Sequence, residues 1–94
     1  MPASIIESGI PVNITGTGNV GAALQDMTLI GFYVNNTTGG TLVLRRGGSG
    51  GTVMSGTITP AIGFHRFPAA CPAGLHATIA NTLDVTFFIQ PGTM

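Results

Sequence analysis

The chain has 94 residues, and only 6% of them are charged, whereas about 25% is usual for a soluble domain. It contains no lysine, and its three arginines balance its three acidic residues, so the formal net charge is zero. Three arginines are too few for the electrostatic footprint of a nucleic-acid-binding protein, and the apolar runs are far shorter than the roughly 20 residues of a membrane span. We therefore expect neither a nucleic-acid partner nor a membrane.

The missing charges are replaced by Gly, Thr, Asn and Ser, while the hydrophobic share of 44% is ordinary. A neutral surface of this kind can be covered by a neighbouring chain at little desolvation cost. We therefore expect a protein that works in an assembly. No basic and apolar leader segment opens the chain, so we expect it to be made in a cytoplasm.

Turn residues divide the chain into short segments of alternating polarity, which is typical of a β-sandwich or barrel. The 15 glycines occur at intervals that would break any helix. We predict an all-β fold, a single antiparallel β-sandwich of jelly-roll type with about seven or eight short strands. Residues 1–11 are predicted to be an N-terminal arm and residues 12–94 the sandwich domain. The predicted strands cover residues 12–15, 27–35, 41–45, 52–58, 62–67, 75–80 and 83–89, with a further short strand or half-turn at 20–24.

Clusters of Gly, Asn and Pro predict the connections between these strands, since Gly and Asn accept a positive φ and Pro stiffens the chain. Turns or loops are expected at residues 16–19, 35–40, 47–51 and 68–74, and a tight connection at 81–82.

Alternation along the predicted strands identifies a core. Phe64 and Phe67 have odd spacing, so at least one of them is expected outside that core unless a bulge intervenes. The expected core residues are Ile30, Phe32, Val34, Leu42, Leu44, Ile58, Ile79, Val85, Phe87 and Ile89.

Two glycine-rich segments match catalytic or cofactor motifs by letter only. Residues 16–21 (GTGNVG) fit the dinucleotide pattern, but too few residues follow for the helix that must hold a pyrophosphate. Residues 47–51 (GGSGG) fit the G-x-S-x-G pattern of the nucleophile elbow in hydrolases. A glycine loop between two strands, however, holds no general base in a fixed position to activate Ser49. We expect no cofactor and no enzymatic activity.

Three further residues have side chains that can bind metals, namely His65, Cys71 and His76. Their spacing fits no closed zinc pattern, so structural histidines and an inert thiol are the simpler interpretation. The acids Glu7, Asp26 and Asp84 form no evident catalytic pair. We predict no metal site and no catalytic residue.

Five segments together resemble a recurrent type of small virion protein of tailed bacteriophages. These are residues 29–44 (LIGFYVNNTTGGTLVL) with the glycine loop after them, 56–60 (GTITP), 64–68 (FHRFP), 73–79 (AGLHATI) and 83–88 (LDVTFF). Such proteins are β-sandwich or jelly-roll modules similar to capsid decoration, or cement, proteins. The resemblance implies a trimer on the outside of an icosahedral shell, bridging subunits of the major capsid protein.

The function we expect is therefore capsid cement on the virion surface. A tail or neck component of the same particle is one alternative. A carbohydrate-binding module is another, although the absence of Trp and the presence of one Tyr argue against an aromatic sugar platform. Aromatic and Arg side chains are enriched at interface hot spots. The expected contacts are therefore the arm, in particular Ile5 and Ile6, and seven residues of the sandwich domain, namely Tyr33, Arg45, Arg46, Met54, Phe64, Arg66 and Phe67.

Overall fold

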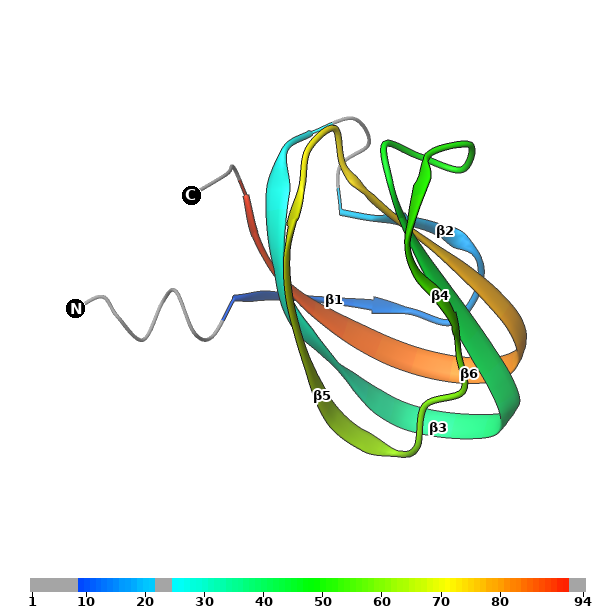
Figure 1. Cartoon of the computed structure of the whole chain (residues 1–94). Helices are drawn as coiled ribbons and strands as arrows, with labels where there is room; N and C mark the ends of the chain where they lie inside the picture. The colour runs from blue at the N-terminus through cyan, green and yellow to red at the C-terminus, as the bar shows by residue number, and fades with distance from the viewer. Residues whose placement is uncertain (1–8, 22–24, 92–94) are drawn as a thin grey trace.

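A computed structural model of the chain describes residues 9–21 and 25–91. These residues form strands and no helix (Figure 1). The strands are β1 (Ile10–Ile14), β2 (Gly18–Val20), β3 (Met27–Arg46), β4 (Thr52–Ile58), β5 (Gly63–Cys71) and β6 (Leu75–Pro91). Every pairing between them is antiparallel, so the predicted all-β, antiparallel class is confirmed.

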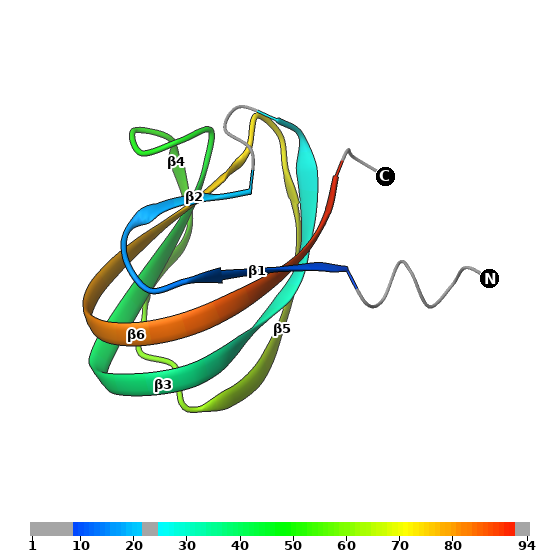
Figure 2. The same cartoon turned by 180° about the vertical axis from the view of Figure 1, so that it is seen from behind.

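Two long strands, β3 and β6, run side by side and are shared by both layers of a sandwich-like fold. Residues 27–34 of β3 pair with β5, and residues 85–89 of β6 pair with β1. Residues 42–46 of β3 pair with β4, and residues 75–77 of β6 pair with β2. The first layer therefore has the order β1–β6–β3–β5, and the second has the order β2–β6–β3–β4. Figure 2 shows β1, β6 and β3 crossing the molecule next to one another.

The predicted turns at residues 35–40 and 81–82 are wrong, because the chain bends there and continues as strand. The β3–β6 register shifts between Val34 and Asn36 and again between Thr38 and Gly39. Gly39 and Asn81 have positive φ, and the Asn81 side-chain amide donates to Gly39 O at 2.9 Å. Residues with turn propensity thus bend two paired strands together instead of reversing either one. The seven or eight short strands of the prediction are therefore six, two of which serve both layers.

Three other boundaries also differ from the prediction. β1 begins at Ile10, inside the predicted arm, and Gly18 and Asn19 of the predicted first turn belong to β2. β5 continues through Pro68 to Cys71, so the predicted loop at 68–74 is shorter. An outer strand tolerates proline because one row of its backbone N–H groups needs no partner. The segment 22–24 lies outside the described residues.

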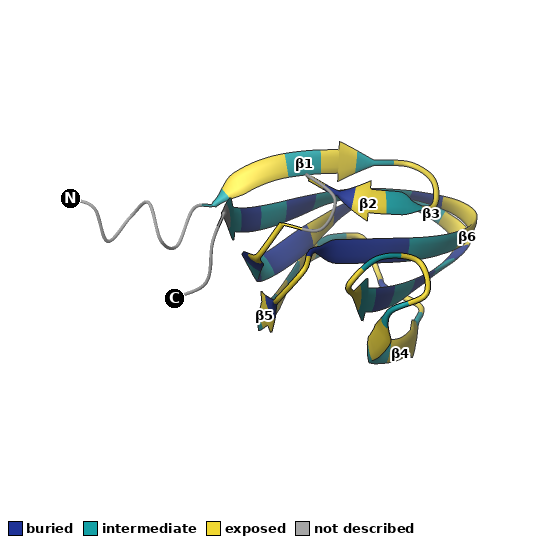
Figure 3. Ribbon diagram, turned by 90° about the horizontal axis from the view of Figure 1, so that it is seen from above, coloured by how far each residue is buried: buried dark blue, intermediate teal, exposed yellow. Residues whose placement is uncertain are grey.

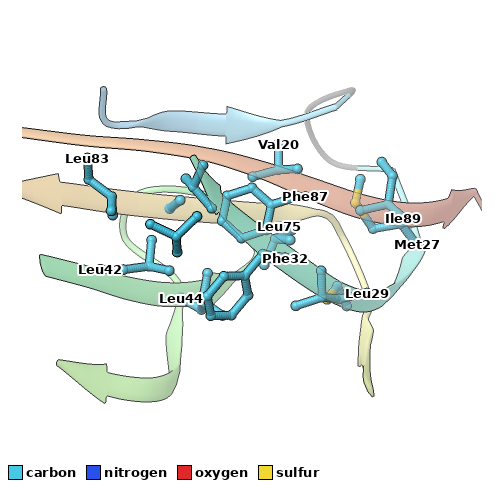
Figure 4. Packing of buried hydrophobic residues seen from close by; sticks show 14 residues of the cluster. Val20, Met27, Leu29, Phe32, Leu42, Leu44, Leu75, Leu83, Phe87 and Ile89 are labelled. Atoms are coloured by element: carbon cyan, nitrogen blue, oxygen red, sulfur yellow. The ribbon is translucent and has the colours of Figure 1, made fainter. Parts of the chain in front are cut away.

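The core lies between the two layers and draws on both (Figure 4). Figure 3 shows the buried residues gathered on β3 and β6, while β1, β4 and β5 are largely exposed or intermediate. Phe32 and Phe87 lie at its centre, with ring centroids 5.7 Å apart. The buried apolar residues are Val20, Met27, Leu29, Phe32, Val34, Leu42, Leu44, Cys71, Leu75, Ala77, Leu83, Val85, Phe87 and Ile89.

Seven of the ten predicted core residues are buried, and Ile30, Ile58 and Ile79 are only partly buried. The error at Ile30 has a local cause. Between Leu29 and Gly31 the register of β3 shifts against both β5 and β6. One extra residue reverses the alternation, so Leu29 joins Phe32 and Val34 in the core in place of Ile30.

Candidate functional site

The outer side of the first layer carries a row of four side chains from four neighbouring strands. Phe64 of β5 is paired with Tyr33 of β3, Tyr33 with Thr86 of β6, and Thr86 with Asn13 of β1. Their sequence neighbours are the more buried residues, so all four side chains point outward. Tyr33 is 41% exposed and Phe64 51%. We call the outer side of this layer face A.

A polar cluster continues face A beyond this row. Asn13 Nδ2 donates to Asp84 Oδ1 at 2.7 Å and to Thr86 Oγ1 at 3.1 Å. Asn35 Nδ2 donates to the same Thr86 Oγ1 at 3.0 Å and to Asp84 Oδ1 at 3.3 Å. Both amide nitrogens are therefore directed into the cluster, and the side chains of Asn13, Asn35, Asp84 and Thr86 hold one another in place.

An apolar area lies on the other side of the row. The ring of Phe64 extends over Gly31, where an added Cβ would lie 2.9 Å from its Cζ atom. It meets Phe88 of β6 with ring centroids 6.0 Å apart. Arg66 of β5, which pairs with Gly31 of β3, is exposed on the same face. A side chain at position 31 would collide with the Phe64 ring, so the glycine leaves room for this ring on face A.

The outer side of the second layer, face B, has different chemistry. Its outward residues on β3 are Val43 and Arg45, which pair with Thr57 and Val53 of β4. Val53 is 46% exposed. Thr78 and His76 of β6 lie on the other side of Val43 and Arg45. Among these residues the only permanent charge is Arg45, whose Nη1 donates to Gly51 O at 3.3 Å.

His76 is buried and only 6% exposed. It lies on the outward side of β6 between Asn19 of β2 and Arg45 of β3. Its Nδ1 atom is buried, and no hydrogen-bond partner for it is found in the described chain.

The structure separates the contact residues expected from the sequence. Tyr33, Phe64 and Arg66 come together on face A. Arg45 lies on face B, Arg46 is exposed at the end of β3, and Met54 packs partly against the core. Phe67 also packs inward, so of the two oddly spaced phenylalanines one lies outside the core, as predicted. Ile5 and Ile6 lie outside the described residues.

Sequence reasoning missed Asn13, Asn35, Asp84 and Thr86 as a group. Asn13 was assigned to a strand, Asn35 to a turn, and Asp84 was one of three acids without an evident catalytic pair. Their common feature in the sequence is a polar residue at an outward position of an apolar strand. Which of those positions become neighbours depends on the pairing of β6 with β1 and β3.

The two glycine-rich motifs are a strand and a loop in the structure. Residues 18–20 of the dinucleotide-like motif are strand β2, and residues 47–51 form the loop between β3 and β4. His65 Nε2 lies 2.8 Å from Ala61 O, and its ring stacks on Phe32. In residues 9–21 and 25–91, no three His, Cys, Asp or Glu side chains gather in a group that could hold a metal ion.

Cys71 is fully buried. Desolvation raises the pKa of its thiol above the usual 9.0. A backbone hydrogen bond at Leu29 and the charge of Arg46 lower this pKa, but by less. A raised pKa in the folded state means that folding favours the neutral thiol. Its contribution to stability is complete below pH 9.0 and is lost as the pH rises through the folded-state pKa.

We therefore expect the free energy of unfolding to fall on raising the pH above 9.0, and the Cys71→Ala variant to show a shallower fall. Urea denaturation of both proteins from pH 7 to pH 11 measures this. Equal slopes in the two proteins would contradict it. We also expect native Cys71 to react with a disulfide reagent much more slowly than the unfolded chain.

Three of the outer strands carry a feature that hinders pairing with a further strand. Pro11 in β1 and Pro68 in β5 have no backbone N–H to donate. In β4, Gly56 has positive φ, which interrupts a regular strand edge. Such features are typical defences against edge-to-edge association, which makes the two faces the better contact surfaces.

No protein-family model, curated protein or solved structure matches the chain. No helix of the described residues is long and apolar enough to cross a membrane. We therefore infer function from the two faces.

Proposed function

We propose that this chain is a structural protein that docks on a larger protein shell through face B and stabilises it. A phage capsid, with the chain acting as cement on the major capsid protein, is the shell that the sequence resemblance favours. The observation that carries the proposal is the chemistry of face B, where Val43, Val53, Thr57 and Thr78 surround one arginine.

Desolvation favours face B over face A as the docking surface. Covering face A with protein would remove water from two charged side chains, Asp84 and Arg66, and burying charge is costly. The residues named on face B include one charged side chain, Arg45, whose guanidinium has a carbonyl partner. Threonine and valine are stiff on a β-strand, so ordering them in an interface costs little entropy.

A docked protein stabilises the shell because it binds the assembled form and not the separated subunits. Several copies joined by symmetry add avidity without any further type of contact. The same proposal therefore includes self-association, and the resemblance favours a trimer.

The test of docking is co-sedimentation of the purified chain with heads of the particle that encodes it, after the native copies have been removed. We expect Val53→Asp to weaken binding at least about tenfold, equivalent to about 1.4 kcal/mol, since it places a carboxylate in the interface. Ile62→Asp is the matched control, because Ile62 is 62% exposed and lies between β4 and β5, outside face B.

Two results would count against this docking surface. One is native-like binding by Val53→Asp together with loss of binding by Ile62→Asp, which would place the contact elsewhere. The other is the absence of binding by the unmodified chain, which would reject the cement function itself.

Light scattering on a sizing column tests the self-association. We expect the mass of a trimer. A ring of six or twelve copies would favour the neck or tail alternative, and a monomer at high concentration would contradict the self-association.

A further inference from the structure

We propose that face A binds a neutral oligosaccharide, with Tyr33 and Phe64 as the stacking surface and Asp84, Asn13, Asn35 and Thr86 as the hydrogen-bonding groups. This goes beyond the docking function and uses the opposite side of the sandwich. The absence of Trp argued against a sugar platform, but the structure brings two exposed aromatic side chains and a fixed polar cluster onto one face.

The hydrogen bonds inside the polar cluster leave specific atoms available. Both asparagine amides direct their N–H groups at Asp84 Oδ1 and Thr86 Oγ1, and Asn13 Nδ2 also lies 3.2 Å from Val85 O. Within the described chain this leaves Asn13 Oδ1, Asn35 Oδ1 and Asp84 Oδ2 without a hydrogen-bond donor. The Thr86 oxygen accepts from both amides, so its own proton is free to be donated. The cluster therefore offers several acceptors and one donor, in fixed positions.

Sugar hydroxyls match this set of atoms. Two adjacent hydroxyls can donate to a carboxylate and a neighbouring amide oxygen, and one hydroxyl oxygen can accept from Thr86. Hydrogen bonds to a charged acceptor such as Asp84 are the strong ones. Because the donors come from the ligand, a ligand made only of acceptors, such as phosphate, does not fit.

The aromatic side chains supply the second half of the site. A pyranose ring presents C–H groups on one side, and the face of an aromatic ring is electron-rich. Tyr33 lies directly between Phe64 and Thr86 in the row, so a sugar stacked on Tyr33 has its hydroxyl edge toward Thr86 and Asp84. Sites that combine aromatic walls with a few fixed polar groups are typical for small ligands.

The size and charge of face A narrow the ligand further. Four strands at about 4.8 Å spacing make the row from Phe64 to Asn13 about 14 Å long, which suits a short oligosaccharide better than a single ring. The carboxylate of Asp84 would repel an acidic sugar. We therefore commit to a neutral glycan with adjacent free hydroxyls.

The experiment is a titration of the full chain with maltohexaose, cellohexaose, mannohexaose and chitohexaose, followed by calorimetry and by backbone amide shifts. We expect saturable binding of at least one of the first three, whose sugar units carry adjacent free hydroxyls, with shifts confined to β1, β5, residues 27–36 of β3 and residues 83–89 of β6. Tyr33→Ala and Asp84→Asn are each expected to weaken binding at least tenfold. Tyr33→Phe is expected to bind like the unmodified chain, because stacking needs the ring and not the hydroxyl.

Two control variants separate this site from the docking surface. Asp26→Asn removes an exposed carboxylate that accepts from Ala73 N–H at another place in the fold, and Val53→Asp alters face B. Both are expected to retain full glycan binding. Amide spectra of all variants establish that they are folded.

Three results would overturn the proposal. One is the absence of binding to all four glycans, and another is binding that Tyr33→Ala and Asp84→Asn leave unchanged. The third is loss of shell docking by these two variants without any glycan binding, which would make face A a protein contact. Failure of shell docking by Val53→Asp alone bears on face B only, so the two proposals can fail separately.

Discussion

Replacing Phe87 by alanine is expected to destabilise the fold by about 3–5 kcal/mol, the usual cost of removing a buried phenylalanine side chain. Phe87 is fully buried and its ring contacts Phe32, so the cavity would open between the two layers. A native domain has only about 5–15 kcal/mol of stability in total, and a chain this short is expected near the lower end. Chemical denaturation of both proteins at pH 7 measures the difference.

Phe64→Ala is the matched control for that experiment. It removes the same atoms from a side chain that is half exposed and whose ring contact is with Phe88 on the surface. We expect a loss of about 1 kcal/mol or less. Equal losses for the two variants would contradict the central place assigned to Phe87.

Gly40→Ala is expected to cost about 3 kcal/mol, because overpacking at this position is met by main chain as well as side chain. A Cβ atom here would collide with Thr82 O and would lie 2.8 Å from Leu83 Cβ. These atoms belong to β6 at the point where β3 and β6 bend together. The substitution would therefore push the two shared strands apart where they join the layers.

Thermal unfolding compared with Gly50→Ala tests this expectation. Gly50 has no heavy atom within 4 Å of an added Cβ, so its substitution is expected to change stability by no more than about 0.5 kcal/mol. A Gly40→Ala protein as stable as Gly50→Ala would show that the bend can open without loss.

The two faces give the molecule a division of tasks that the contact residues expected from the sequence did not suggest. Those residues were treated as one surface, yet Tyr33 and Arg45 lie on the outer sides of different layers. A protein docked through face B would leave face A open to solvent. Glycan binding on an assembled shell is therefore compatible with docking.

Local sequence patterns were sufficient for several elements. The alternation of Val85, Phe87 and Ile89 predicted their common burial, and the structure confirms it. The strand at 52–58 was predicted with its observed bounds. The odd spacing of Phe64 and Phe67 correctly placed one ring outside the core, because a regular strand has a period of two.

The errors occur where a neighbouring strand overrides a local preference. Residues 35–40 have the composition of a turn, but β6 pairs with most of this segment and keeps it extended. Pro68 should end a central strand, yet it is accommodated in β5, which pairs only with β3. The shift between Leu29 and Gly31 involves β5 and β6 together, and no pattern within β3 reveals it.

The amino-acid sequence by itself determined the all-β class, the scarcity of charge and half of the buried apolar positions, because these depend on composition and on a period of two along each strand. Only the tertiary structure decided that two bent strands serve both layers and that Asn13, Asn35, Asp84 and Thr86 meet beside Tyr33. The reason is that register and bulges are set by pairing between segments far apart in the chain, such as Ile10 with Ile89 and Asn13 with Thr86. A side chain's face and its neighbours follow from that pairing and from nothing local.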